Sequence, residues 1–376
     1  MVNQPLVTVV IPTYNRGYCL QRCLDSVLSQ SYQNIEIVLI DDGSEDDTAE
    51  LVKRLSDSES RIRYTHQHNQ GVSVARNHGL RLARGEFVAL LDSDDVWKSW
   101  KLELQLAVMA HLPEVGMVWT DMEAVDEMGT VCDQKYLRKM YNAYQWFPDS
   151  DSLFSRSCAL SSFAPNLSAL IGDVSVGFGD IFSPMIMGNL VHTSTVLIRR
   201  NRLAHVRGFQ KRFRYTGEDY DFHLRTCREG SVAFVDVSSI KYQIDGEDRL
   251  TRPQYSAFMA VHFLITIRPF LKNERSRILL PQSLIDTMLG NSYAWLAESL
   301  FNRGKQIASR PFLCRALRYR PLWPRMMGLY ILSFLQPETI QEYRGLYGSL
   351  KRLGKSFAGR MSLRSGRKGA DPLQGK

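Results

Sequence analysis

Residues 6–17 read LVTVVIPTYNRG, a short apolar run that ends in a polar cluster. The run Leu6–Ile11 is apolar nearly throughout instead of alternating, which is typical of a strand buried on both faces of a parallel sheet. Ile35–Ile40 (IEIVLI) repeats this pattern, and Gly17–Gln30 carries apolar residues at helical spacing. These features predict a strand–helix–strand unit over residues 6–40.

The alternation of strands and helices continues along the chain. Apolar patterning predicts strands at Ile62–Thr65 and Glu86–Leu91, and helices at Thr48–Leu55, Val72–Ala83 and Lys101–Leu112. We therefore predict an α/β fold of Rossmann-like type, with an open, mostly parallel sheet flanked by helices.

The patterning changes after the fourth predicted strand. From about Lys135 to Gly188 the periodicity fails, and a long loop region that shapes a binding site is expected there. Regular patterning returns at Thr195–Ile198 and Asp221–Arg228. After Gln254 the texture is helical, and Ala294–Pro321 resembles one helical hairpin.

Charge divides the chain into two parts. Residues 251–376 hold 21 Lys/Arg against 6 Asp/Glu, while residues 1–250 hold 26 against 33. We expect an α/β domain at 1–250, with halves 1–125 and 126–250. A basic helical extension at 251–350 and a disordered Gly/Ser/Lys/Arg-rich tail at 351–376 are expected to follow.

Compartment and partners are predicted from residue usage. The six cysteines form no CxxC pair, the start MVNQPLVTVVIP lacks the features of a signal peptide, and no apolar run is long enough to span a bilayer. A cytoplasmic location is expected. The basic residues of 303–325 and 351–368 favour peripheral contact with the anionic inner face of a membrane, the alternative being a solvated helical face. Nucleic-acid binding is not expected, because no such motif accompanies the charge.

Three polar clusters follow predicted strands. They are Pro12–Arg16 (PTYNR), Asp41–Ser44 (DDGS) and Asp92–Asp95 (DSDD). Ligands of open α/β sheets bind outside the carboxyl ends of the strands, so we expect these clusters to form one site. The chain has no GxGxxG after the first strand and no GxxxxGK[ST], which disfavours dinucleotide dehydrogenases and P-loop enzymes.

The Asp92–Asp95 cluster predicts a divalent cation. Asp92 and Asp94 are two apart, so in an extended chain both point to one side. Crowded carboxylates repel each other unless a counter-charge is present, and hard oxygen ligands suit Mg²⁺ or Mn²⁺. Such an ion can bridge two phosphates. The alternative is a turn that caps the following helix.

Taken together, these segments resemble the family-2 glycosyltransferases, whose nucleotide-binding fold is called GT-A. The matching segments, in order, are VTVVIPTYNRG (7–17), VLIDDGSEDDT (38–48), NQGVSVARNHGL (69–80), GEFVALLDSDDVW (85–97) and GEDYDFHLR (217–225). The resemblance covers about residues 5–245. It implies a GT-A catalytic domain at 1–250, with a nucleotide-sugar half at 1–125 and an acceptor half at 126–250. The helical pattern beyond it adds a C-terminal helical extension.

The resemblance also implies roles for individual residues. Thr13 and Asp42 would hold the nucleobase and ribose, Arg76 would lie along the diphosphate, and Asp95 would hold the metal with Asp94 shared between ribose and metal. The implied nucleotide-sugar set is Pro12, Thr13, Tyr14, Arg16, Asp41, Asp42, Arg76, Asp92, Ser93 and Asp94.

Candidates for the catalytic base and for a further metal ligand lie in the second half of the 1–250 region. Asp219 matches the proposed catalytic base of the family, with Glu218 as the alternative base, and Asp219 also suits a helix N-cap. His192 precedes a predicted strand and is a candidate to face the metal or the donor phosphates. With Asp94 and Asp95 it completes the expected Mn²⁺ or Mg²⁺ site. His223, inside a predicted helix, is expected to be structural.

The activity that the resemblance implies is metal-assisted, inverting transfer from a nucleotide-sugar donor, most often UDP-linked, to a hydroxyl of a glycan or lipid-linked acceptor. The chain lacks the QxxRW motif and membrane spans of processive polymerases, which favours single-sugar transfer in cell-surface polysaccharide or glycolipid synthesis. Two alternatives stay open: a non-catalytic carbohydrate- or partner-binding protein on a decayed transferase, and a sugar nucleotidyltransferase.

Overall fold

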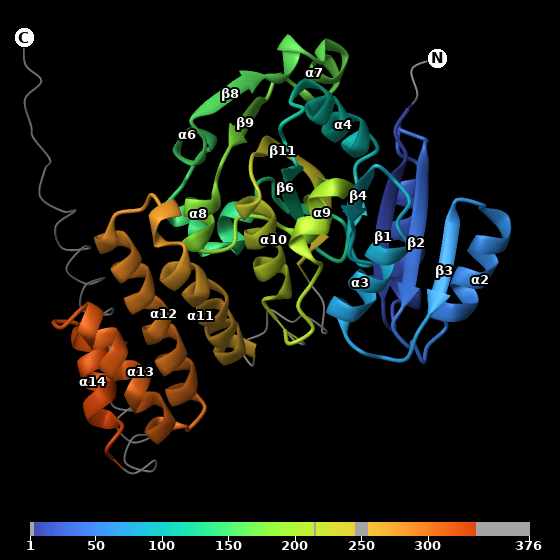
Figure 1. Ribbon diagram of the computed structural model, residues 1–376. Helices are drawn as coiled ribbons and strands as arrows, with labels where there is room; N and C mark the ends of the chain where they lie inside the picture. Colours follow the sequence, from blue (N-terminus) through green and yellow to red (C-terminus); the bar gives the residue numbers. More distant parts are fainter. Residues whose placement is uncertain (1–3, 214–215, 245–254, 336–376) are drawn as a thin grey trace, which may run out of the picture. The chain divides into compact units, whose positions relative to one another are not determined.

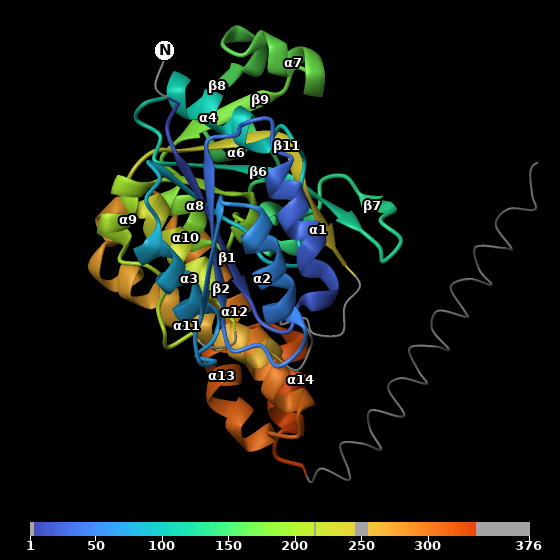
Figure 2. The same ribbon diagram turned by 90° about the vertical axis from the view of Figure 1, so that its right-hand side faces the viewer.

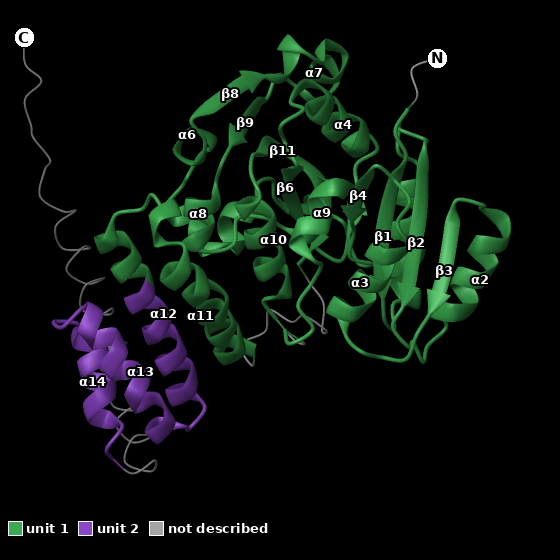
Figure 3. Cartoon of the chain, in the orientation of Figure 1, with its two compact units in different colours: residues 1–288 green, residues 289–376 purple. Residues whose placement is uncertain are grey.

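A computed structural model describes residues 4–213, 216–244 and 255–335 of the chain. The chain divides into two compact units, Met1–Met288 and Leu289–Lys376 (Figure 3). The first unit contains the sheet and the second contains helices. The tail predicted at 351–376 lies outside the described residues.

The first unit begins with the predicted strand–helix alternation (Figure 1). Its elements are β1 Val7–Thr13, α1 Gly17–Leu28, β2 Ile35–Asp41, α2 Thr48–Ser58, β3 Ile62–His66, α3 Val72–Leu82, β4 Phe87–Leu90, β5 Val96–Trp97 and α4 Lys101–His111. β1, β2 and β4 are buried along their whole length. This burial explains why their sequences are continuously apolar instead of alternating.

The parallel strands are ordered β3-β2-β1-β4. The chain moves outward from β1 through β2 to β3, and then returns across them to β4. Right-handed crossovers therefore place α1 and α2 on one face and α3 on the other, as Figure 2 shows. Open α/β sheets bind ligands in a crevice at such a reversal, and this rule places the expected crevice at the carboxyl ends of β1 and β4.

Strands from the second half of the first unit add antiparallel pairs to the sheet. β10 (Leu197–Arg199) is antiparallel to both β4 and β6 (Met117–Val125), and β11 (Val232–Gln243) is parallel to β6. The described residues form an 11-stranded sheet in which β5 and β7 (Val131–Asp133) pair at the sides of β11 and β6. The predicted α/β sheet with flanking helices is confirmed, but its parallel part is confined to the N-terminal strands and the β6–β11 pair.

The prediction of a long loop from about Lys135 to Gly188 is wrong. The segment contains a β-hairpin and short helices: α5 Leu137–Met140, η1 Asn142–Gln145, α6 Ser150–Leu153, β8 Arg156–Ala159, η2 Leu160–Ser162, α7 Pro165–Ile171, β9 Ser175–Gly179 and α8 Phe182–Ile186. β8 is the last strand of the sheet and has no buried residue. A strand with neither face buried leaves no alternation of apolar residues, so the sequence pattern did not predict it.

The remaining elements are mostly helical, which confirms the expected C-terminal helical extension. They are η3 Thr193–Thr195, α9 Arg200–Val206, α10 Glu218–Arg228, α11 Ser256–Asn273, η5 Arg275–Arg277, α12 Gln282–Asn302, α13 Gln306–Tyr319 and α14 Pro324–Leu332. Among the described helices, none combines the length and the hydropathy that crossing a membrane requires.

Helix α11 belongs to the first unit, which therefore extends past the boundary expected near residue 250. The rings of Tyr220 and Phe263 stack at 5.4 Å, and Phe182 meets Phe270 edge-on at 5.7 Å. In the second unit, α12 and α13 form the predicted helical hairpin, with Tyr293 stacked on Tyr319 at 6.1 Å.

The N-terminus of α10 depends on Gly217. This residue has a φ of 81°, in the left-handed region, and a Cβ added there would lie 3.0 Å from the Cβ of His262. The glycine therefore allows both the backbone turn and the close approach of α11 beside the first turn of α10.

We expect Gly217→Ala to destabilise the protein more than Gly129→Ala. Gly129 has a similar φ of 79° but no atom within 4 Å of an added Cβ, so it reports the backbone strain alone. That strain costs about 1 kcal/mol, and the contact with His262 should add about 1 kcal/mol more at Gly217. Urea unfolding of both variants measures the difference. Equal losses would show that α11 moves aside without cost.

Candidate active site

The carboxyl ends of the parallel strands bring the predicted clusters together. Thr13 and Asp41 are paired in register at the ends of β1 and β2, and Asp92 follows β4. β10 runs antiparallel to β4, so the residues before it, including His192, lie beside the loop that follows β4. α10 precedes β11, a strand parallel to β6, and the acidic N-terminus of α10 reaches the same edge.

The first cluster combines a buried hydroxyl and exposed side chains. Pro12 and Thr13 are buried within β1, and Thr13 Oγ1 has no hydrogen-bond partner among the described residues. Tyr14 is exposed. Asn15 has a φ of 52°, and its Oδ1 accepts a hydrogen bond from the Glu45 amide at 2.8 Å. Arg16 follows at the start of α1 with its amide held by Thr48 Oγ1 at 3.0 Å.

The carboxylates of the second cluster are engaged by the chain itself. Asp41 accepts hydrogen bonds from the Ser44 amide at 2.8 Å and the Tyr64 hydroxyl at 2.9 Å. Asp42 accepts from the amides of Gln70 at 3.0 Å and Gly71 at 2.7 Å, and from the side chain of Gln67 at 2.7 Å. Both residues therefore fix loops at this edge of the sheet, and Asp42 holds the backbone amides of the two residues that precede α3.

The third cluster is not extended. The Asp95 amide donates to the Asp92 carbonyl at 3.1 Å, which closes a turn through Ser93 and Asp94. The expectation that Asp92 and Asp94 share one side assumed an extended chain. The turn instead brings Asp92 and Asp95 together and leaves Asp94 on the exposed side.

This loop is held from both sides. The thiols of Cys19 and Cys23 on α1 donate to the carbonyls of Ser93 and Asp92 at 3.5 and 3.7 Å. The Asp92 amide donates to Ser194 Oγ at 3.0 Å. The backbone of the loop is therefore positioned before any ligand binds.

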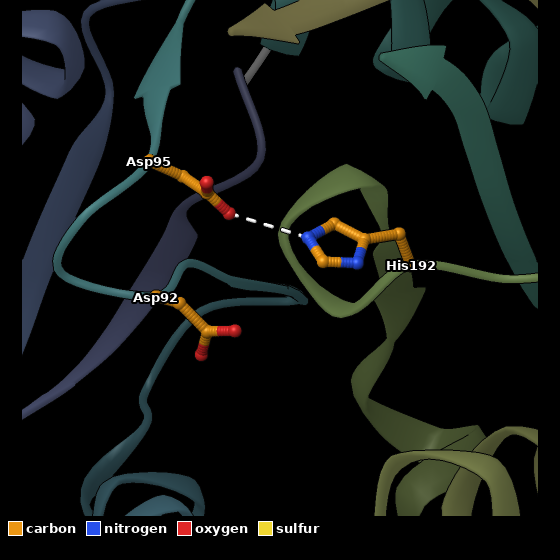
Figure 4. Close-up of side chains that lie close together, drawn as sticks. All are labelled: Asp92, Asp95 and His192. Atoms are coloured by element: carbon orange, nitrogen blue, oxygen red, sulfur yellow. Dashed lines mark hydrogen bonds and ion pairs between the residues drawn. The ribbon is translucent and has the colours of Figure 1, made fainter. Parts of the chain in front are cut away.

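Asp92, Asp95 and His192 form a cluster suited to a cation. One ligand atom from each lies within 4.8 Å of the others, and Figure 4 shows the three side chains converging. His192 Nε2 lies 3.3 Å from Asp95 Oδ2, and its Nδ1 lies 3.2 Å from the Tyr141 hydroxyl. Two carboxylates and one imidazole fit Mn²⁺ or Mg²⁺, and three ligands leave positions for phosphate oxygens.

Electrostatics also favours a cation here. Burial favours a neutral imidazole, but the Asp95 carboxylate outweighs it and raises the pKa of His192 above its ordinary value. Although its side chain reaches solvent, Asp94 is partly desolvated by surrounding atoms, and with the charges of Asp95 and Asp92 this raises its pKa to about 6. A bound divalent cation would relieve this repulsion.

Arg76 links the two halves of the site. Its guanidinium is buried and donates to Asp92 Oδ1 at 2.7 Å and to Glu218 Oε1 at 3.0 Å, and its Nε has no partner among the described residues. Burial opposes ionisation of Asp92, but the Arg76 charge outweighs it and lowers the pKa of Asp92. Arg76 thus compensates the charges of carboxylates from both halves of the site.

Asp219 is the less engaged carboxylate at the start of α10. It is half-buried, and its Oδ2 accepts from Asn189 Nδ2 at 3.1 Å. Burial raises the pKa of Asp219, opposed by the Tyr220 amide and the charge of Arg76. Burial and the Asp219 charge raise the pKa of Glu218 to about 7, despite its ion pair with Arg76.

Several site residues were not predicted from the sequence. Asn189 contacts Asp219, and its amide is oriented because the Val191 N–H donates to Asn189 Oδ1 at 3.1 Å. Tyr141 lies against His192. No local pattern marks either residue, since both contacts join segments far apart in sequence. His223 is fully buried, with Nε2 3.3 Å from Thr193 Oγ1, which fits the structural role expected for it.

We expect the metal alone to bind the Asp92–Asp95–His192 cluster. His192→Ala and Asp95→Asn should each weaken Mn²⁺ binding by at least about tenfold, because loss of a ligand costs no less than loss of an outer partner. Asp94→Asn should weaken it less. Titration followed by the spin resonance signal of free Mn²⁺ measures the affinities.

The affinity should rise with pH through the pKa of His192. The pKa of His192 is raised above its ordinary value. Protons therefore compete with the metal for the imidazole at higher pH than they would at an ordinary histidine. Asp126→Asn, a change of a half-buried turn residue that accepts from the Thr130 amide at 2.8 Å, is the control. Unchanged Mn²⁺ binding in His192→Ala would exclude His192 from the ligand set.

Comparison with known proteins shows what this chain is similar to. Residues 8–166 match the family model described as Glycosyl transferase family 2. Over 104 residues the chain is 40% identical to the UDP-Glc:alpha-D-GlcNAc-diphosphoundecaprenol beta-1,3-glucosyltransferase WfgD of Escherichia coli, covering 28% of this chain and 41% of WfgD.

Two solved structures share the fold. S. aureus TarS 1-349 in complex with UDP-GlcNAc has a TM-score of 0.50 at 16% identity, covering 87% of this chain and 90% of that one. The mannosyltransferase PcManGT from Pyrobaculum calidifontis, in complex with GDP-Man and Mn²⁺, has a TM-score of 0.51 at 17% identity, covering 88% and 86%. These likenesses show the GT-A fold.

The sequence matches to curated relatives are partial. For three of them the matched segment covers 33%, 22% and 44% of the relative's length. The family match nevertheless contains the Pro12–Arg16, Asp41–Ser44 and Asp92–Asp95 clusters, all of which border the crevice of the GT-A sheet. Over residues 8–166 this chain is therefore similar to glycosyl transferase family 2.

Proposed function

We propose that this protein transfers one sugar from a nucleoside-diphosphate donor to an acceptor hydroxyl, with inversion at the anomeric carbon. The observation that carries the proposal is the pairing of two carboxylate groups across one site. Asp92 and Asp95 lie with His192 on the donor side, and Asp219 lies at the helix N-terminus opposite, with Arg76 between them.

Asp219 is proposed as the general base. An acceptor hydroxyl attacks the anomeric carbon while its proton moves to Asp219, and the bond from that carbon to the diphosphate oxygen breaks. The raised pKa of Asp219 suits this role, because a carboxylate of higher pKa accepts a proton more readily. Glu218 is the weaker candidate, since its carboxylate is paired with Arg76 at 3.0 Å.

The donor half is proposed to hold the nucleoside diphosphate. The buried Thr13 hydroxyl, which lacks a partner among the described residues, and the exposed Tyr14 flank the crevice where the base and ribose would lie. Asp92, Asp95 and His192 would hold Mn²⁺ or Mg²⁺, with Asp94 at the rim. When bound, the ion would neutralise charge on the departing diphosphate. UDP is the proposed carrier, the nucleotide named for both WfgD and the TarS complex.

The acceptor and location are proposed from the same relatives. WfgD is named for an undecaprenol-linked acceptor, and a glycan or lipid-linked acceptor is proposed for this chain. The setting that fits is the cytoplasm with peripheral contact at the inner membrane face, in polysaccharide or glycolipid synthesis. The cysteines are all unpaired, as expected in a reducing compartment.

The alternatives are less well supported. A decayed transferase would be free to lose its carboxylates, but Asp92, Asp95 and Asp219 are present and positioned by Arg76, His192 and Asn189. A sugar nucleotidyltransferase is disfavoured by the family match over residues 8–166.

The proposal is tested with Asp219→Asn. Transfer from UDP-sugars to a lipid-linked or simple glycoside acceptor should fall by about 10²–10⁴-fold, while nucleotide affinity stays near wild type, because the base acts on the acceptor. Glu218→Gln should cost less. The anomeric configuration of the product, read by NMR, tests inversion. A retained configuration, or full activity of Asp219→Asn, would contradict the mechanism.

Asn189 is predicted to position the base. Its amide donates to Asp219 Oδ2 and so stabilises the ionised carboxylate. Asn189→Ala should lower kcat by about tenfold and shift the acidic limb of the pH–rate profile to higher pH, because the Asp219 pKa rises further and the base must be ionised. Asn201→Ala, a change of an exposed asparagine, is the control. An unshifted limb would limit Asn189 to a structural role.

A further inference from the structure

The second unit carries an exposed apolar stripe on its last described helix. Leu322, Met327, Ile331, Phe334 and Leu335 are 84%, 42%, 65%, 58% and 40% exposed. Met327, Ile331 and Phe334 are spaced by four and then three residues, so they lie on one side of α14 and its continuation. Met326 and Ser333, seven residues apart on a neighbouring side of the helix, are buried.

Positive charge surrounds this stripe. Residues 289–335 contain 7 Lys/Arg and 1 Asp/Glu by count of the sequence. The Arg310 guanidinium lies 4.1 Å from the ring of Phe334, at one end of the stripe, and donates to the Ser333 carbonyl at 2.6 Å. At the other end, Arg320 lies 5.0 Å from the ring of Trp323.

We propose that this stripe, formed by Leu322, Met327, Ile331, Phe334 and Leu335, binds the surface of an anionic lipid bilayer. Apolar side chains next to exposed arginines suit the boundary between acyl chains and headgroups, and each cation there attracts anionic lipid. The nearly complete absence of acidic residues disfavours a basic or neutral partner surface.

The short helix and the mixture of apolar and charged contacts favour shallow, reversible binding to the bilayer. α14 spans Pro324–Leu332, which is too short to cross a bilayer but long enough to lie in its interface. The charged and apolar contributions act together, so neither alone should hold the protein on a vesicle. A salt-sensitive association is therefore expected, since the Debye length shortens with ionic strength.

A membrane-binding surface would bring the enzyme to a lipid-linked acceptor, and this link rests on the proposed function. Binding to the bilayer itself does not require a donor or turnover. Vesicle binding and nucleotide binding are therefore separate measurements, and either can fail alone. Nucleotide binding without vesicle binding overturns only the surface, and the reverse result overturns only the transferase assignment.

The test is flotation of the full chain with vesicles of neutral phosphatidylcholine, with or without 30 mol% phosphatidylglycerol (about one lipid in three, a strongly anionic surface). The wild type should float with anionic vesicles at low salt and be released at high salt. Met327→Gln/Ile331→Gln and Arg318→Gln/Arg320→Gln should each lower the partition coefficient by about tenfold or more.

Matched changes on the first unit provide the controls. Leu170→Gln removes another exposed apolar side chain, and Lys53→Gln/Arg54→Gln removes two exposed charges on α2; neither should alter flotation. All substitutions are at exposed positions, and equal melting temperatures would verify that the fold is kept.

Three results would overturn the proposal. No flotation of the wild type would exclude the bilayer as partner. Flotation unchanged in both stripe variants would assign binding to another part of the chain. Self-association that the Met327→Gln/Ile331→Gln variant abolishes, seen by analytical ultracentrifugation without vesicle binding, would make the stripe an interface between copies of this chain.

Discussion

The site depends on keeping many carboxylates close together without mutual repulsion. Asp92, Asp94, Asp95, Glu218 and Asp219 meet at one edge of the sheet. Burial, together with the charges of neighbouring carboxylates, raises the pKa values of Asp94 and Glu218. The buried Arg76 offsets part of it through its ion pairs with Asp92 and Glu218. The charge that remains uncompensated, beside His192, is where a divalent cation fits.

The fold explains why these groups meet. The parallel strands β1, β2 and β4 place the loops of Thr13, Asp41 and Asp92 at their carboxyl ends, and the antiparallel β10 brings His192 back to the same edge. α10 then presents its acidic N-terminus there, where the helix dipole favours negative charge and opposes the effect of burial. One constraint of sheet topology therefore assembles residues separated by more than a hundred positions, from Thr13 to Asp219.

The sequence predicts the N-terminal half of this arrangement well, because strands buried on both faces read as continuous apolar runs that end in polar clusters. It does not predict the β8–β9 hairpin, whose edge strand has no buried residue, or the contacts of Asn189 and Tyr141, which join distant segments. The grouping of Asp92 with Asp95 also required the structure, since alternation along an extended chain favours Asp94 and the loop instead turns.

Calorimetric titration of the full chain with UDP, GDP and dTDP, each in Mn²⁺ and in EDTA, tests the central claim most directly. The site described above predicts that one nucleotide binds in Mn²⁺ and loses most of its affinity in EDTA. An Asp94→Ala/Asp95→Ala variant should lose the metal-dependent part. If no nucleotide binds under either condition, the edge of the sheet is not a donor site, and a non-catalytic scaffold would explain the structure better.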